Sequence, residues 1–288
     1  MLSKAASYYE LTKPGITLSV VASMLVGFLL GSAASLDLIL MAHAIIGTYL
    51  IAAGTAAHNM FLERRLDGLM HRTNQRPLPA SRLSSAESAW FSTILIFGGL
   101  AYLLSVVNVV AGIVSLATTV IYLFAYTPLK RISALNVFVG AVPGALPVVG
   151  GWAAATGTVF EHGMWILFGI VFCWQIPHVI AIAWVTRKDY EHAGFQMLPK
   201  NDPHGYKAAT WVLLPAILLI PSMIKLYTMD YLGLIFLAGS LLVTAGFIWY
   251  SIRFAISRDI KTAKLVMFSS FAYLPLIWLL IFVDWIIL

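Results

Sequence analysis

Hydrophobic residues fall into long, nearly uncharged runs separated by short polar segments. A run of about 20 apolar residues is long enough to cross a bilayer as a helix, and these runs lack the short alternating pattern of a barrel strand. They lie near residues 14–31, 38–60, 88–106, 109–126, 136–156, 164–185, 208–226, 231–252 and 265–287. The pattern predicts one all-α domain over residues 1–288, a membrane bundle of about nine transmembrane helices.

Composition agrees with this fold class. Apolar residues make up 60% of the chain and charged residues 10%, far from the values of a soluble domain. Cys173 is the only cysteine, so no intrachain disulfide and no thiolate metal cluster is expected, and we interpret it as a packing residue. The chain is therefore predicted to be an integral membrane protein embedded in a lipid bilayer.

Positive charge predicts the orientation. Nearly every Lys and Arg precedes the first run or follows an even-numbered run, and Lys225 alone lies on the other side. By the positive-inside rule the N-terminus is cytoplasmic and the C-terminus outside. The net charge of +6 then reflects topology, and no nucleic-acid partner is expected. The N-terminus lacks the Arg-rich amphipathic lead of an organelle transit peptide, which favours a bacterial plasma (inner) membrane.

The second apolar run ends in a polar stripe, which we define as Asn59, Glu63 and Asp67. Residues four apart on a helix differ by only about 40° in direction, so the three side chains would share one face. This segment opens one of three cytoplasmic loops expected to carry the active site, at about 59–87, 127–135 and 186–207. The stripe is the strongest candidate for chemistry in the chain.

Carboxylates at a water-accessible helix end suit a hard cation. Mg²⁺ binds one or two carboxylates together with substrate phosphates, and Glu63, Asp67 and Asp189 are the candidate metal ligands. Arginine and lysine bind the phosphate oxygens themselves. The candidate diphosphate-binding residues are Arg72, Arg76, Lys130, Arg131 and Lys188. The simpler alternative is that these charges only set topology and form weak helical salt bridges.

The stripe and its continuation, Asn59-x-x-x-Glu63-x-x-x-Asp67-x-x-Met70-x-Arg72-Thr73-x-x-Arg76-Pro77, resemble the first aspartate-rich motif of UbiA-type intramembrane prenyltransferases. The Arg-Thr continuation is similar to the heme O synthase branch of that family. Further matching stretches are Tyr126-Thr-Pro-Leu-Lys130-Arg131, Gly140-Ala-Val-Pro143-Gly144-Ala-Leu-Pro147, Trp174-Gln175-Ile-Pro177-His178 and Asp189-Tyr190 with Ala193-Gly194 and Met197-Leu198-Pro199.

Two departures from the family pattern concern the acids. Glu63 stands where the family usually has Asp, and the doubled acid before Tyr190 is reduced to Lys188-Asp189. Glutamate keeps the charge and lengthens the reach by one methylene, so metal binding should survive. The second motif is the weaker assignment.

The resemblance implies a reaction and a set of roles. A farnesyl group would pass from farnesyl diphosphate to a vinyl group of protoheme (heme B), with addition of water, giving heme O and diphosphate. Asn59, Glu63, Asp67 and Asp189 would be catalytic, Mg²⁺ would be the cofactor, and heme would be a substrate and not a prosthetic group. Heme A synthase or terminal-oxidase assembly proteins are the partners this implies.

The acceptor pocket is expected in the sixth run, where Gln175 and His178 are unusual polar residues within the membrane. Pro177 is expected to break the helix there and let both side chains line one cavity. Tyr126 completes the expected pocket through the resemblance. A neutral imidazole can ligate heme iron, although hydrogen bonding of His178 to a neighbouring helix is the commoner role. His43 and His58 compete as ligands.

Three alternatives stay open from the sequence. The acceptor can instead be an aromatic quinone precursor, because the heme assignment rests on resemblance. A transporter fits poorly, since such carriers usually bury charged groups near the bilayer midplane. The Gly and Pro residues of run 136–156 favour close helix packing, with a wall for an isoprenoid tail as the functional interpretation.

Overall fold

The computed structural model describes residues 3–32 and 35–287, and this part of the chain is helical without any strand. Nine helices in it are long and apolar enough to cross a membrane, which confirms the predicted fold class. The elements are α1 (Lys4–Leu11), α2 (Pro14–Gly31), α3 (Leu38–Asp67), α4 (Ser85–Tyr102), η1 (Leu103–Val107), α5 (Val109–Val120), η2 (Ile121–Tyr126), α6 (Thr127–Leu129), α7 (Asn136–Thr156), α8 (His162–Val185), α9 (Arg187–His192), α10 (Tyr206–Thr228), α11 (Leu234–Ser257) and α12 (Ile260–Ile287).

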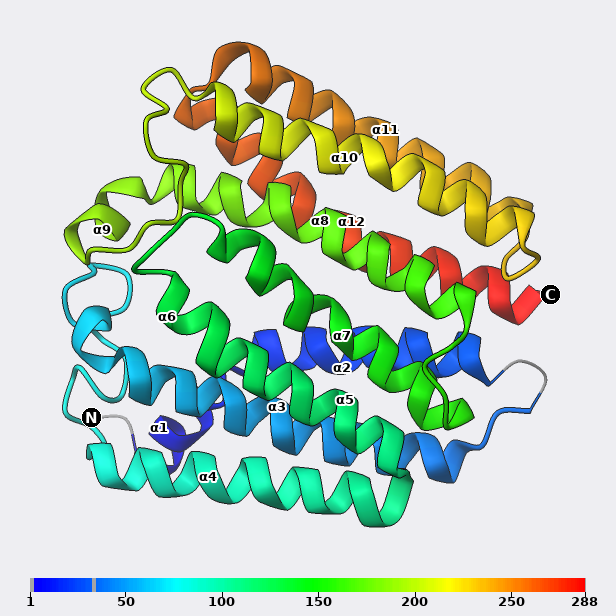
Figure 1. Ribbon diagram of the computed structural model, residues 1–288, viewed down its shortest axis with the longest axis horizontal. Helices are drawn as coiled ribbons and strands as arrows, with labels where there is room; N and C mark the ends of the chain where they lie inside the picture. The colour runs from blue at the N-terminus through cyan, green and yellow to red at the C-terminus, as the bar shows by residue number, and fades with distance from the viewer. Residues whose placement is uncertain (1–2, 33–34, 288) are drawn as a thin grey trace.

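The long helices run side by side with their ends grouped at two opposite ends of the bundle (Figure 1). The end that holds α9, α6 and the loop after α3 is called the charged end here, and the C-terminus lies at the other (Figure 1). η1 and η2 are π-helical turns that continue α4 and α5. Such turns often occur at functional sites, and η2 ends at the charged end with Tyr126.

Polar side chains define where several helices begin. Ser84 and Glu87 form a capping box at the start of α4, and Asn108 caps α5 by accepting from the Ala111 N–H at 2.8 Å. Far from the charged end, the buried Asp284 carboxylate of α12 accepts from the backbone N–H groups of Gly233 and Phe236 at the start of α11. These caps satisfy helix N–H groups that have no intrahelical partner.

Helix α7 is packed against α2 through glycine, as its composition predicted. A Cβ added to Gly27 would lie 1.9 Å from the Val148 carbonyl oxygen, and one added to Gly151 would lie 1.8 Å from that of Met24. Small residues allow this close backbone approach. Because one face of α7 packs directly on the backbone of α2, the opposite face of α7 is held in a fixed position beside the site.

Three features differ from the sequence predictions. Helix α8 continues through Pro177, so the expected break does not occur; membrane helices tolerate proline where neighbouring groups compensate for the lost hydrogen bond. Helix α3 extends to Asp67, seven residues beyond the predicted end of its apolar run, and so carries the whole stripe. The short helix α1, which packs through Leu11 against α3, was not predicted.

Candidate functional site

The polar stripe lies on the last two turns of α3 and faces inward. The exposed fractions of Asn59, Glu63 and Asp67 are only 1%, 6% and 1%. The predicted helical face therefore exists and is buried, which is unusual for two carboxylates. A buried charge needs an ion-pair or hydrogen-bond partner, because the protein interior solvates charges much less well than water does.

Each member of the stripe is paired with one cation from a different segment. Lys13 Nζ donates to Asn59 Oδ1 at 2.9 Å, and Lys130 Nζ donates to Glu63 Oε1 at 2.9 Å. Arg76 Nη1 donates to Asp67 Oδ1 at 2.7 Å. Two of these cations, Lys130 and Arg76, belong to the predicted diphosphate set, and they meet the two predicted metal ligands of α3.

The two lysines differ in their electrostatic state. Burial, together with the charge of Arg76, lowers the pKa of Lys13 to about 7, and the charges of Glu63 and Asp67 offset this only in part. Burial also lowers the pKa of Lys130, but the nearby Tyr126 hydroxyl and Glu63 carboxylate outweigh that effect and raise it above its ordinary value. Lys130 is thus a permanent cation, whereas Lys13 changes charge near neutral pH.

One carboxylate oxygen of the stripe has no partner. Asp67 Oδ2 is fully buried and accepts no hydrogen bond within the described chain, although Oδ1 is bound by Arg76. An orphaned anionic oxygen beside a second carboxylate suits a hard divalent cation. No group of three or more His, Cys, Asp or Glu side chains lies close enough to hold a metal ion within residues 3–32 and 35–287. Asp189 is therefore not gathered with Glu63 and Asp67 here.

The second acidic segment lies on α9 at the same end of the bundle. Asp189 is half-buried and Lys188 is exposed. The neighbouring Tyr190 connects α9 to the loop after α3, because Arg72 donates to its hydroxyl at 2.5 Å and lies 4.7 Å from its ring centroid. Arg72 therefore contacts α9, not the stripe. Arg131 is exposed and forms no side-chain hydrogen bond or ion pair with any described residue.

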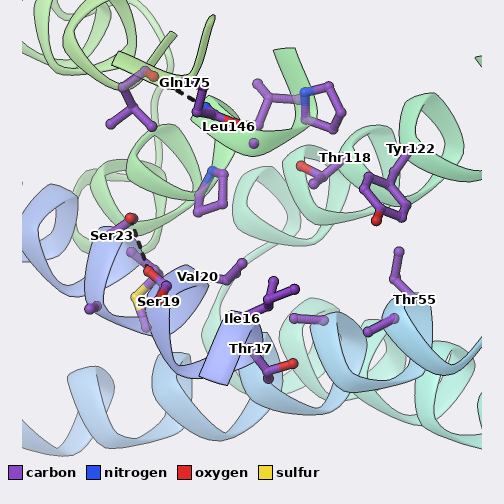
Figure 2. A pocket seen from close by; sticks show the side chains of 18 of the residues that line it. Ile16, Thr17, Ser19, Val20, Ser23, Thr55, Thr118, Tyr122, Leu146 and Gln175 are labelled. Atoms are coloured by element: carbon purple, nitrogen blue, oxygen red, sulfur yellow. Dashed lines mark hydrogen bonds between the residues drawn. The ribbon is translucent and has the colours of Figure 1, made fainter. Parts of the chain in front are cut away.

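A cavity of about 800 Å³ extends from the charged end into the bundle. Its wall is mainly apolar and comes from α2, α3, α5, η2, α7, α8 and α12, and Figure 2 shows side chains from several of these helices around the common space. Lys13 and Tyr126 line it near the stripe, and Lys130 Nζ lies 4.5 Å from the centroid of the Tyr126 ring. The cavity therefore reaches the ion-paired cluster at Lys13, while Asn59, Glu63 and Asp67 themselves are not among the residues that line it.

Gln175 and His178 line the same cavity, as predicted. Gln175 Nε2 donates to the Val171 carbonyl at 3.2 Å, and its amide occupies the space left by Gly144, where a Cβ would lie 1.9 Å from Oε1. Gly140 makes the same room for the Tyr126 ring. The glycines of α7 thus serve close packing on one face and the cavity wall on another.

The competing histidines do not border this cavity. His43 Nδ1 bonds with the Tyr102 hydroxyl at 2.7 Å, and His58 Nδ1 bonds with Ser92 Oγ at 2.9 Å, both between α3 and α4. The residues around the cavity include neither of them. Among the three histidines proposed as heme ligands, only His178 is placed to meet a molecule inside it.

Sequence reasoning missed Lys13 and Thr127. Lys13 was interpreted as a topology signal, yet it reaches Asn59 from a left-handed backbone conformation (φ 46°) just before Pro14. Thr127 Oγ1 accepts from Asn59 Nδ2 at 3.2 Å. A lysine placed directly before a helix-starting proline was the available signal for Lys13, because proline fixes the direction in which the chain enters the helix.

The fold and the site define an integral membrane enzyme with an apolar cavity that ends in a buried cluster of carboxylates and cations. The chain belongs to the UbiA prenyltransferase family, whose model matches residues 20–274. A protoheme IX farnesyltransferase of Solibacter usitatus (strain Ellin6076) is 40% identical over 286 residues, which cover 96% of this chain and 98% of that protein.

Two solved structures share the fold. The structure of a digeranylgeranylglyceryl phosphate synthase superposes with a TM-score of 0.82 at 18% identity, and all of both chains is covered. A UbiA homolog from Archaeoglobus fulgidus bound to GPP and Mg²⁺ superposes with a TM-score of 0.66 at 15% identity, over 96% of this chain and 99% of that one. At these identities the likeness concerns the fold alone.

Proposed function

We propose that this enzyme transfers a farnesyl group from farnesyl diphosphate to a vinyl group of protoheme and adds water, giving heme O and diphosphate. One observation carries the proposal: Lys13, which binds Asn59 of the polar stripe, and Tyr126 line the same cavity as the Gln175–His178 pair. A donor held at the charged end and an acceptor held by α8 would therefore share one apolar chamber. The name of the Solibacter relative supports the choice of both substrates.

The donor half of the site uses charge. Lys130, Arg76 and Lys13 would bind the oxygens of the diphosphate, and the exposed Arg131 after α6 and Lys188 on α9 would reach it from the surface. Glu63 and Asp67, joined by Asp189 from α9, would hold Mg²⁺, and the orphaned Asp67 Oδ2 supports this assignment. The metal would supply positive charge against the departing diphosphate. The A. fulgidus homolog with GPP and Mg²⁺ supports the use of this cation in the family.

The cationic side chains favour the first step because they stabilise the negative charge that develops on the leaving group. The bond between the allylic carbon and the diphosphate oxygen breaks, and its electron pair leaves with the diphosphate. The vinyl π electrons of the porphyrin then form the new carbon–carbon bond to the allylic carbon. Water adds to the resulting vinyl-derived cation and releases a proton, which completes the hydroxyethylfarnesyl group.

The apolar wall has a distinct role in this sequence. An allylic cation reacts with any nearby water, and exclusion of bulk solvent protects such an intermediate. The cavity is lined predominantly by aliphatic and aromatic side chains of α2, α5, α7 and α12. The farnesyl chain would lie along this wall, with its diphosphate against the stripe.

The location follows from charge. Because the cations gather at the charged end, the positive-inside rule supports an active site that faces the cytoplasm in a bacterial plasma membrane. A product that stays in the membrane suits direct transfer, and heme A synthase or terminal-oxidase assembly proteins are the partners we propose for it.

The test is a reaction with purified full-length protein in detergent, Mg²⁺, farnesyl diphosphate and either protoheme or 4-hydroxybenzoate. We expect a porphyrin product heavier by one farnesyl group plus one hydroxyl group, detected by mass spectrometry, and no prenylated benzoate. Prenylated 4-hydroxybenzoate without any porphyrin product would overturn the acceptor and favour an aromatic substrate. Prenylation of neither compound would contradict the proposed function as a whole.

A further inference from the structure

His178 is held by a hydrogen bond whose direction can be assigned. Its Nδ1 lies 2.7 Å from Ser270 Oγ of α12, and that oxygen lies 2.6 Å from the Met267 carbonyl oxygen. A hydroxyl has one proton, and a carbonyl oxygen can only accept. The 2.6 Å contact favours donation by Ser270 to Met267, so that Ser270 accepts from His178 and Nδ1 of the imidazole carries a proton.

The opposite ring nitrogen is consequently a free acceptor. A charged imidazolium is costly inside a membrane, and a neutral imidazole with its proton on Nδ1 keeps a lone pair on Nε2. In residues 3–32 and 35–287, Nδ1 is the only atom of this ring with a hydrogen-bond partner, and the residue borders the large cavity. His178 thus offers a metal-binding nitrogen to whatever occupies that cavity.

The ring is also fixed in orientation. Trp174 stacks on it with ring centroids 5.0 Å apart and an angle of 20° between the planes, and Phe271 packs edge-on at 5.0 Å. Trp174 Nε1 itself donates to the Ser270 backbone carbonyl at 2.9 Å. Helices α8 and α12 therefore hold the imidazole on two faces and at Nδ1.

A second histidine–serine pair in the same protein provides a comparison. His58 and Ser92 repeat the arrangement, because Ser92 Oγ lies 2.9 Å from His58 Nδ1 and donates to the Ala89 carbonyl at 2.9 Å. That pair joins α3 to α4 and does not border the cavity. The His58–Ser92 pair shows that such a bond can simply join two helices, and the α8–α12 pair differs from it because His178 also borders a ligand-sized space.

We propose that Nε2 of His178 is the axial ligand of the porphyrin iron, and that Ser270 is a positioning residue that fixes its tautomer and direction. This inference rests on the proposed function, in which an iron porphyrin is the acceptor. Histidines that bind metals commonly donate their other ring N–H to a fixed acceptor, and the Ser270 hydroxyl fills that role here. His178 lies seven residues before the end of α8, about 10 Å from the charged end, so the porphyrin is held below the stripe.

The test compares binding of protoheme with binding of metal-free protoporphyrin IX to full-length protein in lipid nanodiscs. In Ser270→Ala we expect the Kd for protoheme to rise about tenfold, and in His178→Ala by at least as much. The Kd for the metal-free porphyrin should stay within about twofold, because no axial bond is lost. The control is Ser269→Ala, which removes the adjacent half-buried hydroxyl and its bond to the Val266 carbonyl but no contact with His178.

A spectroscopic rescue completes the test. Ferrous protoheme in the unmodified protein should show an iron–histidine signature that is lost in His178→Gly and restored by added imidazole. The ligand assignment would be overturned if the variants lost affinity for both porphyrins equally. It would also be overturned if the iron spectrum were unchanged in His178→Gly, even when the enzyme makes farnesylated heme. Failure to make any prenylated porphyrin would instead overturn the proposed function, so the two failures are distinguishable.

Discussion

The two acidic regions at the charged end both supply carboxylates, but the first is buried and the second is partly exposed. Glu63 and Asp67 lie within a continuous helix, are at most 6% exposed, and are each bound to a cation. Asp189 lies on the six-residue helix α9, is half-buried, and forms no ion pair within the described residues. The first region is buried and neutralised, whereas the second is partly exposed and contacts the loop after α3 through Tyr190, which accepts from Arg72.

Under the proposed function, this difference would keep the site ready for a charged substrate. Burying two carboxylates is costly unless cations neutralise them, and removing one partner of such a pair costs about 3–5 kcal/mol. In the proposed reaction the same cations would turn to diphosphate oxygens when a metal ion takes over the carboxylates. In this proposal the shape of the stripe is preorganised, its partners exchange when substrate binds, and α9 would contribute at the open side of the cluster.

The largest effect is expected from neutralising the stripe. Asp67→Asn and Glu63→Gln remove the charge and keep the shape, so we expect turnover to fall about 10³-fold, the scale seen when one preorganised electrostatic group is lost. The measurement is steady-state formation of the prenylated porphyrin. Near-normal turnover in both variants would mean that the stripe is only a helix end.

A folding defect must be separated from this loss. Glu63→Gln leaves Lys130 buried without its anion, which is destabilising. The double variant Glu63→Gln with Lys130→Met should recover thermal stability, because a buried pair can be replaced by uncharged side chains. Recovery of turnover along with stability would show that the single substitution acted through folding.

A smaller effect is expected at the second region. Asp189→Asn should lower turnover about tenfold, equivalent to about 1.4 kcal/mol, because its carboxylate must first join a site formed mainly by α3. The matched control is Glu191→Gln, an exposed acid two residues along the same helix. A loss as large as that of Asp67→Asn would remove the distinction between the two regions, and equal turnover in the Asp189 and Glu191 variants would take Asp189 out of the site.

The fold could be predicted because the bilayer imposes helix length. The predicted limits 14–31 and 136–156 coincide with α2 and α7, and the stripe at Asn59, Glu63 and Asp67 lies on one helical face as its spacing required. In these segments a local rule, either hydrophobic length or helical period, was sufficient.

Pairing between distant segments could not be predicted in the same way. The contacts of Lys13 with Asn59 and of His178 with Ser270 join residues 46 and 92 positions apart, and both depend on which helices become neighbours. The expected helix break at Pro177 failed for a related reason, because the surroundings of a proline decide whether a membrane helix continues through it. The direction of Arg72 toward Tyr190 was likewise set by the packing of the loop after α3 against α9.

The smallest effect is expected at Lys13, which belongs to the buried region and titrates near neutral pH. With a pKa of about 7, its ammonium is charged below that pH and neutral above it, among Arg76, Glu63, Lys130 and Asp67. A bound diphosphate stabilises the charged form, so binding above pH 7 must take up a proton. The affinity for inorganic diphosphate should therefore decline as pH rises above 7, by at most about tenfold per pH unit.

Lys13→Arg isolates this contribution, since a guanidinium stays charged throughout the range. Diphosphate binding to both proteins is measured by calorimetry between pH 6 and 9 in the same buffer. The ionisation of diphosphate itself then cancels in the ratio of the two affinities. We expect the ratio of the two affinities to favour the arginine variant increasingly above pH 7. A constant ratio would mean that Lys13 keeps its charge, and the buried cluster would then hold three permanent cations around the stripe.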